Sequence, residues 1–530
     1  MKKLLCLVLS VIMIFSSSAI AFAAEDVTPV IVVSGMGAYP LVNEDGTNAF
    51  PVEGGVIAEN VFSLLPFAVG SMLTDDFSLF NNNGMKYIAN IFEPIACDEN
   101  GNSVRNVTNK DFPGTAANHK EELSKKESNE AHMVCKIANE IGWDNTYYMY
   151  YDWRKSPLDI ADKLKGVVDE ALATSETGKV SLYAISFGGM VTASYIYKYG
   201  TENIKNIVFS STAFQGVEMV GEIFANRIDL NVEDAIGFLT NLVVEYPFIA
   251  GILGFSQEAL EKYGKYSSHL VNAYLQHIED EISLDLFKNV FADTFAHFKG
   301  MWAMIPYEFY DEAKTFMKAN CNISDSFLES ADEYMYNVQL SLENLFTKAE
   351  NAGTSVYVTG AYGYNEIPVT EGKSNQCDDL IDSYLKTAGG TFAPYGEILD
   401  GDDYRRNVVC YTHNHKSTDE IADLSTCMRP EQTWVVKGMK HVELQEYNET
   451  SDLGLWLVTS EEKVDVYSDE RYPQFVELDR KTGKFVSLTE GVTLSEKTTA
   501  DLTPIFRAIM RFIDVIMERF VRIWGTAEVK

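Results

Sequence analysis

The segment Val180–Met190 constrains the fold more than any other part of the chain. An apolar run, Val-Ser-Leu-Tyr-Ala-Ile, passes directly into Ser186, Phe187, two glycines and a helical pattern. This order predicts a sharp strand-to-helix turn that exposes the Ser186 hydroxyl. Ala184 stands where the usual G-x-S-x-G pattern has its first glycine, and alanine is small enough for such a turn. We expect Ser186 to be a nucleophile, and the alternative is an ordinary helix N-cap.

Short buried strands alternate with amphipathic helices on both sides of this segment. The alternation predicts an α/β fold with a mostly parallel central sheet and helices on both faces. The expected strands are 29–33, 146–151, 180–184 and 207–209, with two later strands at 355–359 and 433–436, and the expected helices are 131–142, 160–174 and 190–199.

The chain divides into five predicted parts. Residues 25–214 form the first part of the core, and 351–450 form the second part. Between them, 215–350 are helix-patterned and rich in apolar and aromatic residues, which predicts an inserted helical cap. Residues 451–530 form a C-terminal extension. In its last part, Leu502–Trp524, polar residues recur on one helical face, which predicts an amphipathic helix. That helix packs on the body of the protein, or lies against a membrane or a cell surface.

Residues 1–24 have the pattern of a secretory signal peptide. Two lysines precede an apolar run, and Ala21-Phe22-Ala23 offers a cleavage site. The apolar run is shorter than the roughly 20 residues of a spanning helix, so we expect a secreted protein. Six cysteines remain after this segment, and disulfides and free thiols are both open to them.

The formal net charge of the chain is −34. Binding to nucleic acid requires clustered lysine and arginine, so this charge excludes most nucleic-acid partners.

A serine nucleophile needs a general base and a carboxylate that orients it, in the chain order Ser, Asp or Glu, His. His441 follows the last expected strand and is the predicted base. Asp419 is the predicted acid, and Asp423 and the cluster 400–403 are the alternatives. The backbone amides of Phe187 and of Met36, in the glycine-containing loop after the first strand, are the predicted oxyanion hole.

His413 and His415 are either a pair of metal ligands or part of a polar loop. We favour the loop, because the sequence shows no obvious Cys or His partners for them. We expect no metal and no cofactor.

Several segments resemble, in order, the lecithin:cholesterol acyltransferase and phospholipase family of α/β-hydrolases. They are Pro29–Gly37, the Tyr-Asp-Trp-Arg motif at 151–154, Ala184–Gly189, the Tyr-Gly turn at 362–363, Asp419–Thr426 and Gly438–Leu444. Glu420 stands where the family has a glycine, and a polar insertion at about 371–415 separates the Tyr-Gly turn from the acid segment.

The resemblance implies an α/β-hydrolase fold and a triad of Ser186, Asp419 and His441. It also implies fatty-acyl ester substrates, cleaved by water or transferred to an alcohol. We expect Tyr151, Trp153 and Trp302 to contact the substrate. The alternatives are a catalytically inert surface-binding protein on a hydrolase scaffold, suggested by Ala184 and Glu420, and a peptidase on the same fold.

Overall fold

The computed structural model describes residues 27–494 except for a set of short internal ranges and the range 230–286. The predicted signal peptide (1–24) and the predicted helix Leu502–Trp524 lie outside the described residues. The shorter undescribed ranges are 53–58, 61–62, 65, 68–69, 72–73, 75, 110, 126–128, 292–293, 367–369, 371–373, 402–404, 406 and 442.

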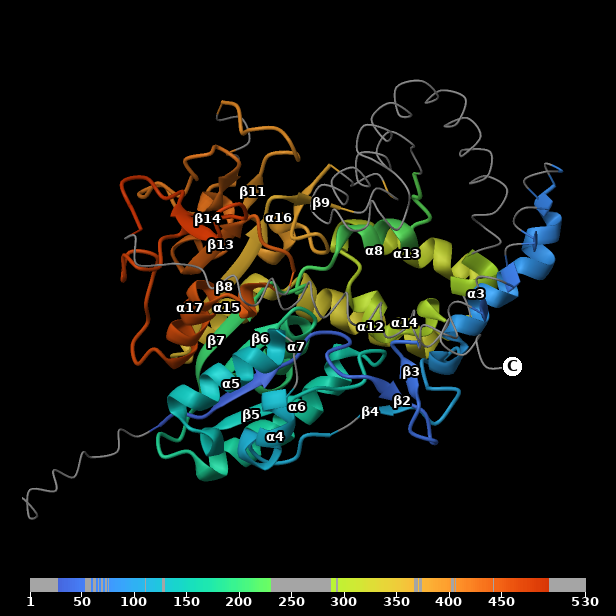
Figure 1. The fold of residues 1–530 in the computed structure, drawn as a ribbon, viewed down its shortest axis with the longest axis horizontal. Coiled ribbons are helices and arrows are strands. Elements are labelled where there is room, and N and C mark those ends of the chain that lie inside the picture. Colours follow the sequence, from blue (N-terminus) through green and yellow to red (C-terminus); the bar gives the residue numbers. More distant parts are fainter. Residues whose placement is uncertain are drawn as a thin grey trace, which may run out of the picture.

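An eight-stranded sheet runs through the centre of the molecule in the order β15-β14-β13-β8-β7-β6-β1-β5 (Figure 1). Every neighbouring pair is parallel except β14 and β15, which are antiparallel. The predicted α/β class with a mostly parallel sheet is therefore confirmed. The strands are β1 (Val30–Val33), β5 (Thr146–Met149), β6 (Val180–Ile185), β7 (Ile204–Ser210), β8 (Ser355–Tyr362), β13 (Thr433–Lys437), β14 (Phe475–Asp479) and β15 (Lys484–Ser487).

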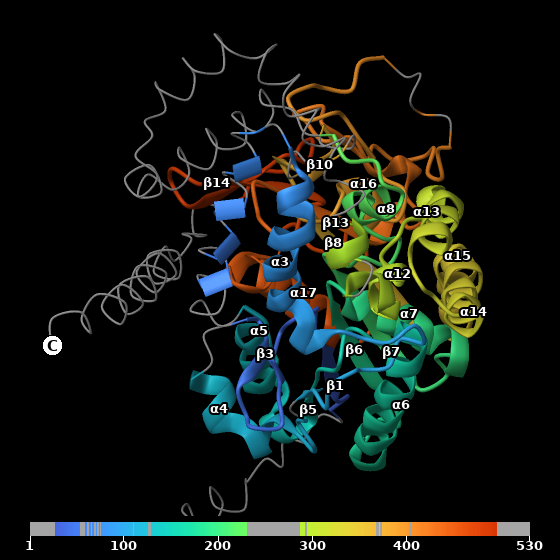
Figure 2. The same cartoon turned by 90° about the vertical axis from the view of Figure 1, so that its right-hand side faces the viewer.

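Helices cover both faces of the sheet (Figure 2). Ile31 and Val33 of β1 face one hydrophobic cluster, and Val30 and Val32 face another. Alternate residues thus serve opposite faces, and both are apolar because both are buried. The first cluster contains α6 (Pro157–Thr174), α7 (Gly188–Tyr199) and α15 (Leu342–Asn351), and the second contains α5 (Asn129–Ile141) and α17 (Asn448–Thr459).

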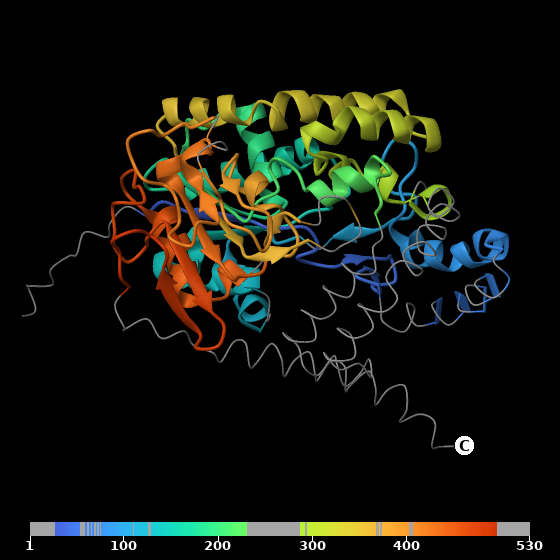
Figure 3. The ribbon, with the colours of Figure 1, turned by 90° about the horizontal axis from the view of Figure 1, so that it is seen from above.

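The expected cap does not stand apart from the core where it is described. Its helices form a layer along one side of the sheet, yellow in Figure 3. Phe346 of α15 packs on Phe209 of β7 with ring centroids 5.2 Å apart, and Trp302 belongs to the same cluster as the strands. The described residues of 215–350 therefore pack as an extension of the core. These elements are α8 (Glu218–Phe224), α12 (Lys299–Ala303), α13 (Tyr307–Asn320), α14 (Asp325–Tyr334) and the π-turn η7 (Met335–Gln339).

The core also continues beyond the expected boundary at residue 450. Helix α17 crosses that boundary and packs on the sheet. Strand β14 then pairs in parallel with β13, and β15 closes the edge. The first part of the predicted extension thus belongs to the sheet.

Small elements surround the sheet at the loops. The short strands are β2 (Leu41–Val42), β3 (Asn48–Phe50), β4 (Thr108–Asn109), β9 (Tyr364–Asn365), β10 (Gln376–Cys377), β11 (Thr391–Phe392) and β12 (Ala422–Asp423), and the remaining helices are α3 (Met85–Phe92), α4 (Lys120–Lys125) and α16 (Ser383–Lys386).

All six cysteines in the described part of the chain are free thiols. Within that part, no helix combines the length and the apolar character that crossing a membrane requires.

Candidate active site

Ser186 occupies the sharp turn between β6 and α7. Its φ is +52°, a left-handed conformation that is uncommon for a residue with a side chain. The turn is held by its neighbours. The amide of Ser186 donates to the carbonyl of Ser210, and the amides of Ala213 and Gly189 donate to the carbonyl of Ser186. The strained turn is therefore built into the sheet.

The two glycines after the serine are required by close packing. A Cβ on Gly188 would lie 2.4 Å from the carbonyl oxygen of Val33, and a Cβ on Gly189 would lie 2.4 Å from the Cβ of Thr212. Any side chain at either position would displace a neighbour. Ala184, by contrast, is fully buried in β6, where its methyl group is accommodated.

His441 lies in the loop after β13 and reaches Ser186. Its Nε2 is 2.8 Å from the Oγ of Ser186. Its Nδ1 is 3.0 Å from the Oδ2 of Asp378. An ionised carboxylate can only accept, so Nδ1 carries the proton and Nε2 accepts a hydrogen bond from the Ser186 hydroxyl. This tautomer suits a general base acting on a serine.

The acid beside His441 is Asp378, so the predicted pairing with Asp419 is wrong. Asp378 follows β10 and is fully buried. Its Oδ2 also receives the Lys386 ammonium at 2.6 Å, and its Oδ1 accepts from the amide of Ile381 at 2.8 Å. Burial alone would raise the pKa of Asp378. The Lys386 charge and His441 outweigh it and hold the pKa well below its usual range.

Asp419 has other partners. One of its oxygens accepts from Lys437 at 2.9 Å, and the other accepts from the hydroxyl of Ser417 at 2.5 Å. Because the carboxylate is tied to a strand residue and a turn residue, it supports the loop that precedes β12. The alternative acid Asp423 is also placed elsewhere, since it caps a short turn by accepting from the Ser425 amide.

Asp378 was missed because it lies within the polar insertion, where the sequence shows no strand or helix pattern of useful length. One signal could have found it. The run Cys377-Asp378-Asp379-Leu380-Ile381 places carboxylates between apolar residues. An aspartate with buried neighbours on both sides needs partners, and this one finds Lys386 and His441.

The predicted oxyanion loop lies against the serine. A Cβ on Gly35 would approach the Cβ of Ser186 to 3.0 Å. The amide of Gly35 itself donates to Glu130 Oε1 at 2.9 Å, so it is already occupied. Among the described residues, neither the Met36 amide nor the Phe187 amide donates to another protein group.

Glu130 is a buried carboxylate beside this loop that the sequence did not suggest. It lies at the start of α5, and its second oxygen accepts from the hydroxyl of Tyr148 at 2.9 Å. Burial is the largest cause that raises the pKa of Tyr148 well above its usual value, and Glu130 adds to it. This pair fixes the loop that carries Gly35.

Tyr151, Trp153 and Trp302, the residues expected to contact the substrate, are buried and pack within the core. The hydroxyl of Tyr151 donates to the carbonyl of Ser34 and so braces the loop beside Ser186. Trp153 packs edge-to-face on Phe298, and the Trp302 indole donates to the carbonyl of Ala296 at 2.8 Å.

Asp152 and Arg154 of the Tyr-Asp-Trp-Arg motif form a buried ion pair. The Arg154 guanidinium, 1% exposed, binds Asp152 through Nε and Nη2. Its Nη1 donates to the carbonyl of Ile95 at 2.9 Å and to the hydroxyl of Ser103 at 3.0 Å. The motif therefore fixes the loop around 95–103 against the core.

Comparison with family models finds no match, and comparison with curated proteins finds none. Among solved structures, the chain is similar to one described as the crystal structure of the Tle4-Tli4 complex, with 10% identity and a TM-score of 0.30. The match covers 82% of this chain and 98% of that chain. A likeness this weak carries no argument about function.

Proposed function

We propose that the protein is a secreted serine esterase of the α/β-hydrolase fold that acts on fatty-acyl esters of lipids through an acyl-enzyme. One observation carries the chemistry. Ser186, His441 and Asp378 form a continuous chain of hydrogen bonds, with heavy-atom distances of 2.8 and 3.0 Å. This is the arrangement that activates a serine hydroxyl.

The proposed reaction has two steps. His441 Nε2 takes the hydroxyl proton as Ser186 Oγ forms a bond to the ester carbonyl carbon. The resulting imidazolium is stabilised by Asp378 and gives its proton to the departing alcohol oxygen. A water or an alcohol then gives a proton to Nε2 and attacks the acyl carbon. Nε2 returns this proton to Ser186 Oγ as the bond between that oxygen and the acyl carbon breaks, which releases the acid or a new ester.

The negative charge that develops on the carbonyl oxygen needs donors. The Phe187 amide follows the nucleophile directly, and Met36 lies in the loop that packs against Ser186. We propose these two amides as the oxyanion hole. Loss of one such donor typically lowers kcat by about 10²–10³.

The lipid class rests on the resemblance to the lecithin:cholesterol acyltransferase and phospholipase family, which implies fatty-acyl ester substrates. Ala184 and Glu420, the two residues that suggested an inert scaffold, give it little support. Ala184 fits in its strand, and Glu420 forms an ion pair with Lys416.

The experiment compares the wild-type protein with Ser186→Ala on phosphatidylcholine vesicles, with and without a long-chain alcohol. Free fatty acid and new ester are quantified together. Ser194→Ala is the matched control, because this hydroxyl is buried in α7 and has no hydrogen-bond partner among the residues that the structure describes. Serine-dependent fatty acid indicates a lipase or phospholipase, and serine-dependent ester indicates an acyltransferase.

Two results would contradict the proposal. Cleavage of short peptides in preference to acyl esters would indicate a peptidase. Failure of an activated phosphonate to label Ser186, together with no product above the Ser186→Ala background, would indicate an inert scaffold.

A further inference from the structure

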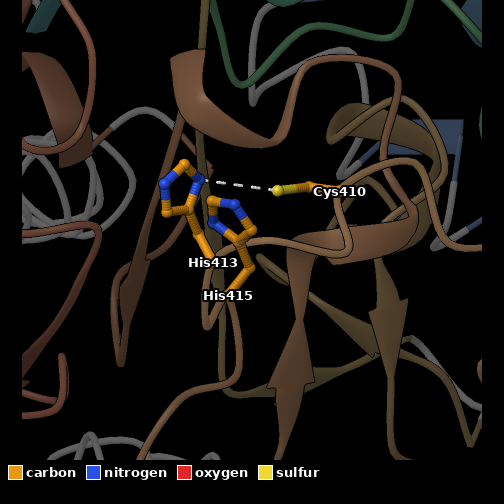
Figure 4. A group of neighbouring side chains, drawn as sticks. All are labelled: Cys410, His413 and His415. Carbon is orange, nitrogen blue, oxygen red and sulfur yellow. Dashed lines mark hydrogen bonds between the residues drawn. The ribbon is translucent and has the colours of Figure 1, made fainter.

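Cys410, His413 and His415 come together in a small cluster far from the proposed catalytic chemistry. Their ligand atoms all lie within 4.8 Å of one another. Figure 4 shows both imidazoles presenting a nitrogen toward the Cys410 sulfur, which lies 3.7 Å from His413 Nδ1. The sequence favoured a polar loop for the two histidines, because the role of Cys410 as their partner was not apparent from the pattern.

The buried imidazole of His415 determines which of its nitrogens is free to bind. Gln474 Nε2 donates to the carbonyls of Pro430 and Thr433, so Gln474 Oε1 is an acceptor. His415 Nδ1 lies 2.8 Å from that oxygen and must carry the proton.

His415 Nε2 therefore carries no proton and has a free lone pair. The residue is 1% exposed, and within the described part of the chain this nitrogen makes no hydrogen bond of ordinary geometry, although the Cys410 sulfur lies close enough to interact with it. A buried acceptor without a donor is unfavourable, and a cation at this point would satisfy it. Metal-binding histidines are commonly oriented in this way, by a hydrogen bond from the other ring nitrogen.

We propose that Cys410, His413 and His415 bind a Zn²⁺ ion. Zn–S and Zn–N bonds of about 2.3 and 2.0 Å place the sulfur and nitrogen of a tetrahedral site about 3.6 Å apart. The observed 3.7 Å between Cys410 Sγ and His413 Nδ1 fits that geometry.

Three protein ligands are assigned, because among the described residues only Cys410, His413 and His415 have ligand atoms that all lie within 4.8 Å of one another. Glu431 lies beside them, with its Oε1 2.9 Å from His413 Nδ1. The fourth position of the ion is left to water or to this carboxylate.

Cysteine binds zinc as the thiolate. The hydroxyl of Thr412 lies 3.5 Å from the Cys410 sulfur, where it can donate a hydrogen bond to that form.

The position of the cluster indicates a structural role. The turn Pro430–Gln432, which contains Glu431, directly precedes β13, and Gln474 directly precedes β14, so the cluster lies at the amino ends of these parallel strands. His441 follows the carboxyl end of β13. Zinc would fasten the 409–415 segment to the sheet without entering the reaction, so this inference does not depend on the proposed function.

The test is a Zn²⁺ titration of the full-length protein against a chromophoric chelator under reducing conditions, with thermal unfolding measured in parallel. The variants are Cys410→Ser and His413→Gln, whose side chain is partly exposed. Cys135→Ser is the matched control, since Cys135 is a free, partly buried thiol in α5. Cobalt(II) replaces zinc in a second titration to report the ligands spectroscopically.

We expect one Zn²⁺ per chain in the wild type and in Cys135→Ser, with a higher unfolding temperature when zinc is present. Both cluster variants should lose at least about 100-fold in zinc affinity. Removing a residue that only hydrogen-bonds to a metal ligand costs up to about 100-fold, and removing a ligand itself should cost no less. Cobalt should give a thiolate charge-transfer band that Cys410→Ser abolishes. Equal zinc binding by wild type and Cys410→Ser, or cobalt bound without that band, would overturn the proposal.

Discussion

The Lys386 ammonium lies 2.6 Å from Oδ2 of Asp378, the same oxygen that faces His441 Nδ1. Both Lys386 and Asp378 are fully buried. Lys386 also donates to the carbonyl of Ala361 at 2.9 Å, which ties the pair to β8. One carboxylate oxygen thus serves a structural cation and the imidazole of the proposed general base.

Removing the cation should therefore affect stability and activity together. In Lys386→Met the carboxylate of Asp378 stays buried with one partner fewer, and its pKa rises. Breaking a buried pair in this way costs about 3 kcal/mol or more in the free energy of unfolding, measured by urea titration. Lys318→Met removes an exposed ion pair and should change stability by less than about 1 kcal/mol. Equal losses in both variants would contradict the buried-pair argument.

Asp378→Asn should abolish most of the esterase activity. The amide can hold the imidazole in the wrong tautomer, and the analogous change in a serine-protease triad lowers kcat by about 10⁴. Asp419→Asn should keep activity within about tenfold, because Asp419 binds Lys437 and Ser417. Turnover of a short acyl ester by both variants checks this. Greater loss in Asp419→Asn than in Asp378→Asn would overturn the assignment of the acid.

Gly189→Ala should impair folding. The new methyl group would lie 2.4 Å from Thr212 Cβ, and overpacking of this kind typically costs about 1–3 kcal/mol. Gly166→Ala is the control. It lies inside α6, where a Cβ would have no atom within 4 Å, so helix propensity alone predicts a gain of up to about 1 kcal/mol. Thermal unfolding of both variants gives the comparison, and a stabilised Gly189→Ala would show that the turn is less tightly packed than described.

Glu366→Gln should weaken the dependence of stability on pH. Burial is the largest cause that raises the Glu366 pKa to about 11, with Asp382 adding to it. The folded state therefore holds a proton that the unfolded chain releases above its ordinary pKa of 4.5. Stability from this group is greatest below that value and falls as the pH rises toward 11, by up to about 1.4 kcal/mol per pH unit.

Urea titrations from about pH 5 to about pH 9 measure how the free energy of unfolding changes with pH. This range lies between the pKa of Glu366 in the unfolded chain and its pKa in the folded protein. The matched control is Glu397→Gln at an exposed position, which should leave the slope unchanged. An identical slope in wild type and Glu366→Gln would show that Glu366 ionises normally in the folded protein.

The sequence predicted best what depends on local patterns. The serine turn follows from an apolar strand, small residues and a helix that are contiguous, and His441 follows from its place after a strand. The other strands of the large sheet were predicted from their apolar runs, but β14 and β15 were missed because charged or polar residues interrupt their short sequences, Phe-Val-Glu-Leu-Asp and Lys-Phe-Val-Ser.

The features that the sequence did not predict depend on contacts between residues that are far apart in the chain. The sequence favoured Asp419 and did not suggest Asp378, and only the folded insertion brings Asp378 to His441. The same holds for Trp302, whose aromatic surroundings suggested a substrate wall but enclose it completely. The proximity of Cys410 to His415 likewise depends on the folded conformation of the segment 410–415.

Ser186 and His441 are separated by 255 residues of chain, and the strand that carries His441 into place pairs with β8 and β14. During synthesis the serine turn is therefore complete long before its base exists. Such long-range parallel pairing is slow to form. A nascent, truncated or nicked chain that ends before β13 would possess the serine but no means of activating it. Ser186 would then become a reactive nucleophile only after the chain is complete and the whole sheet has assembled.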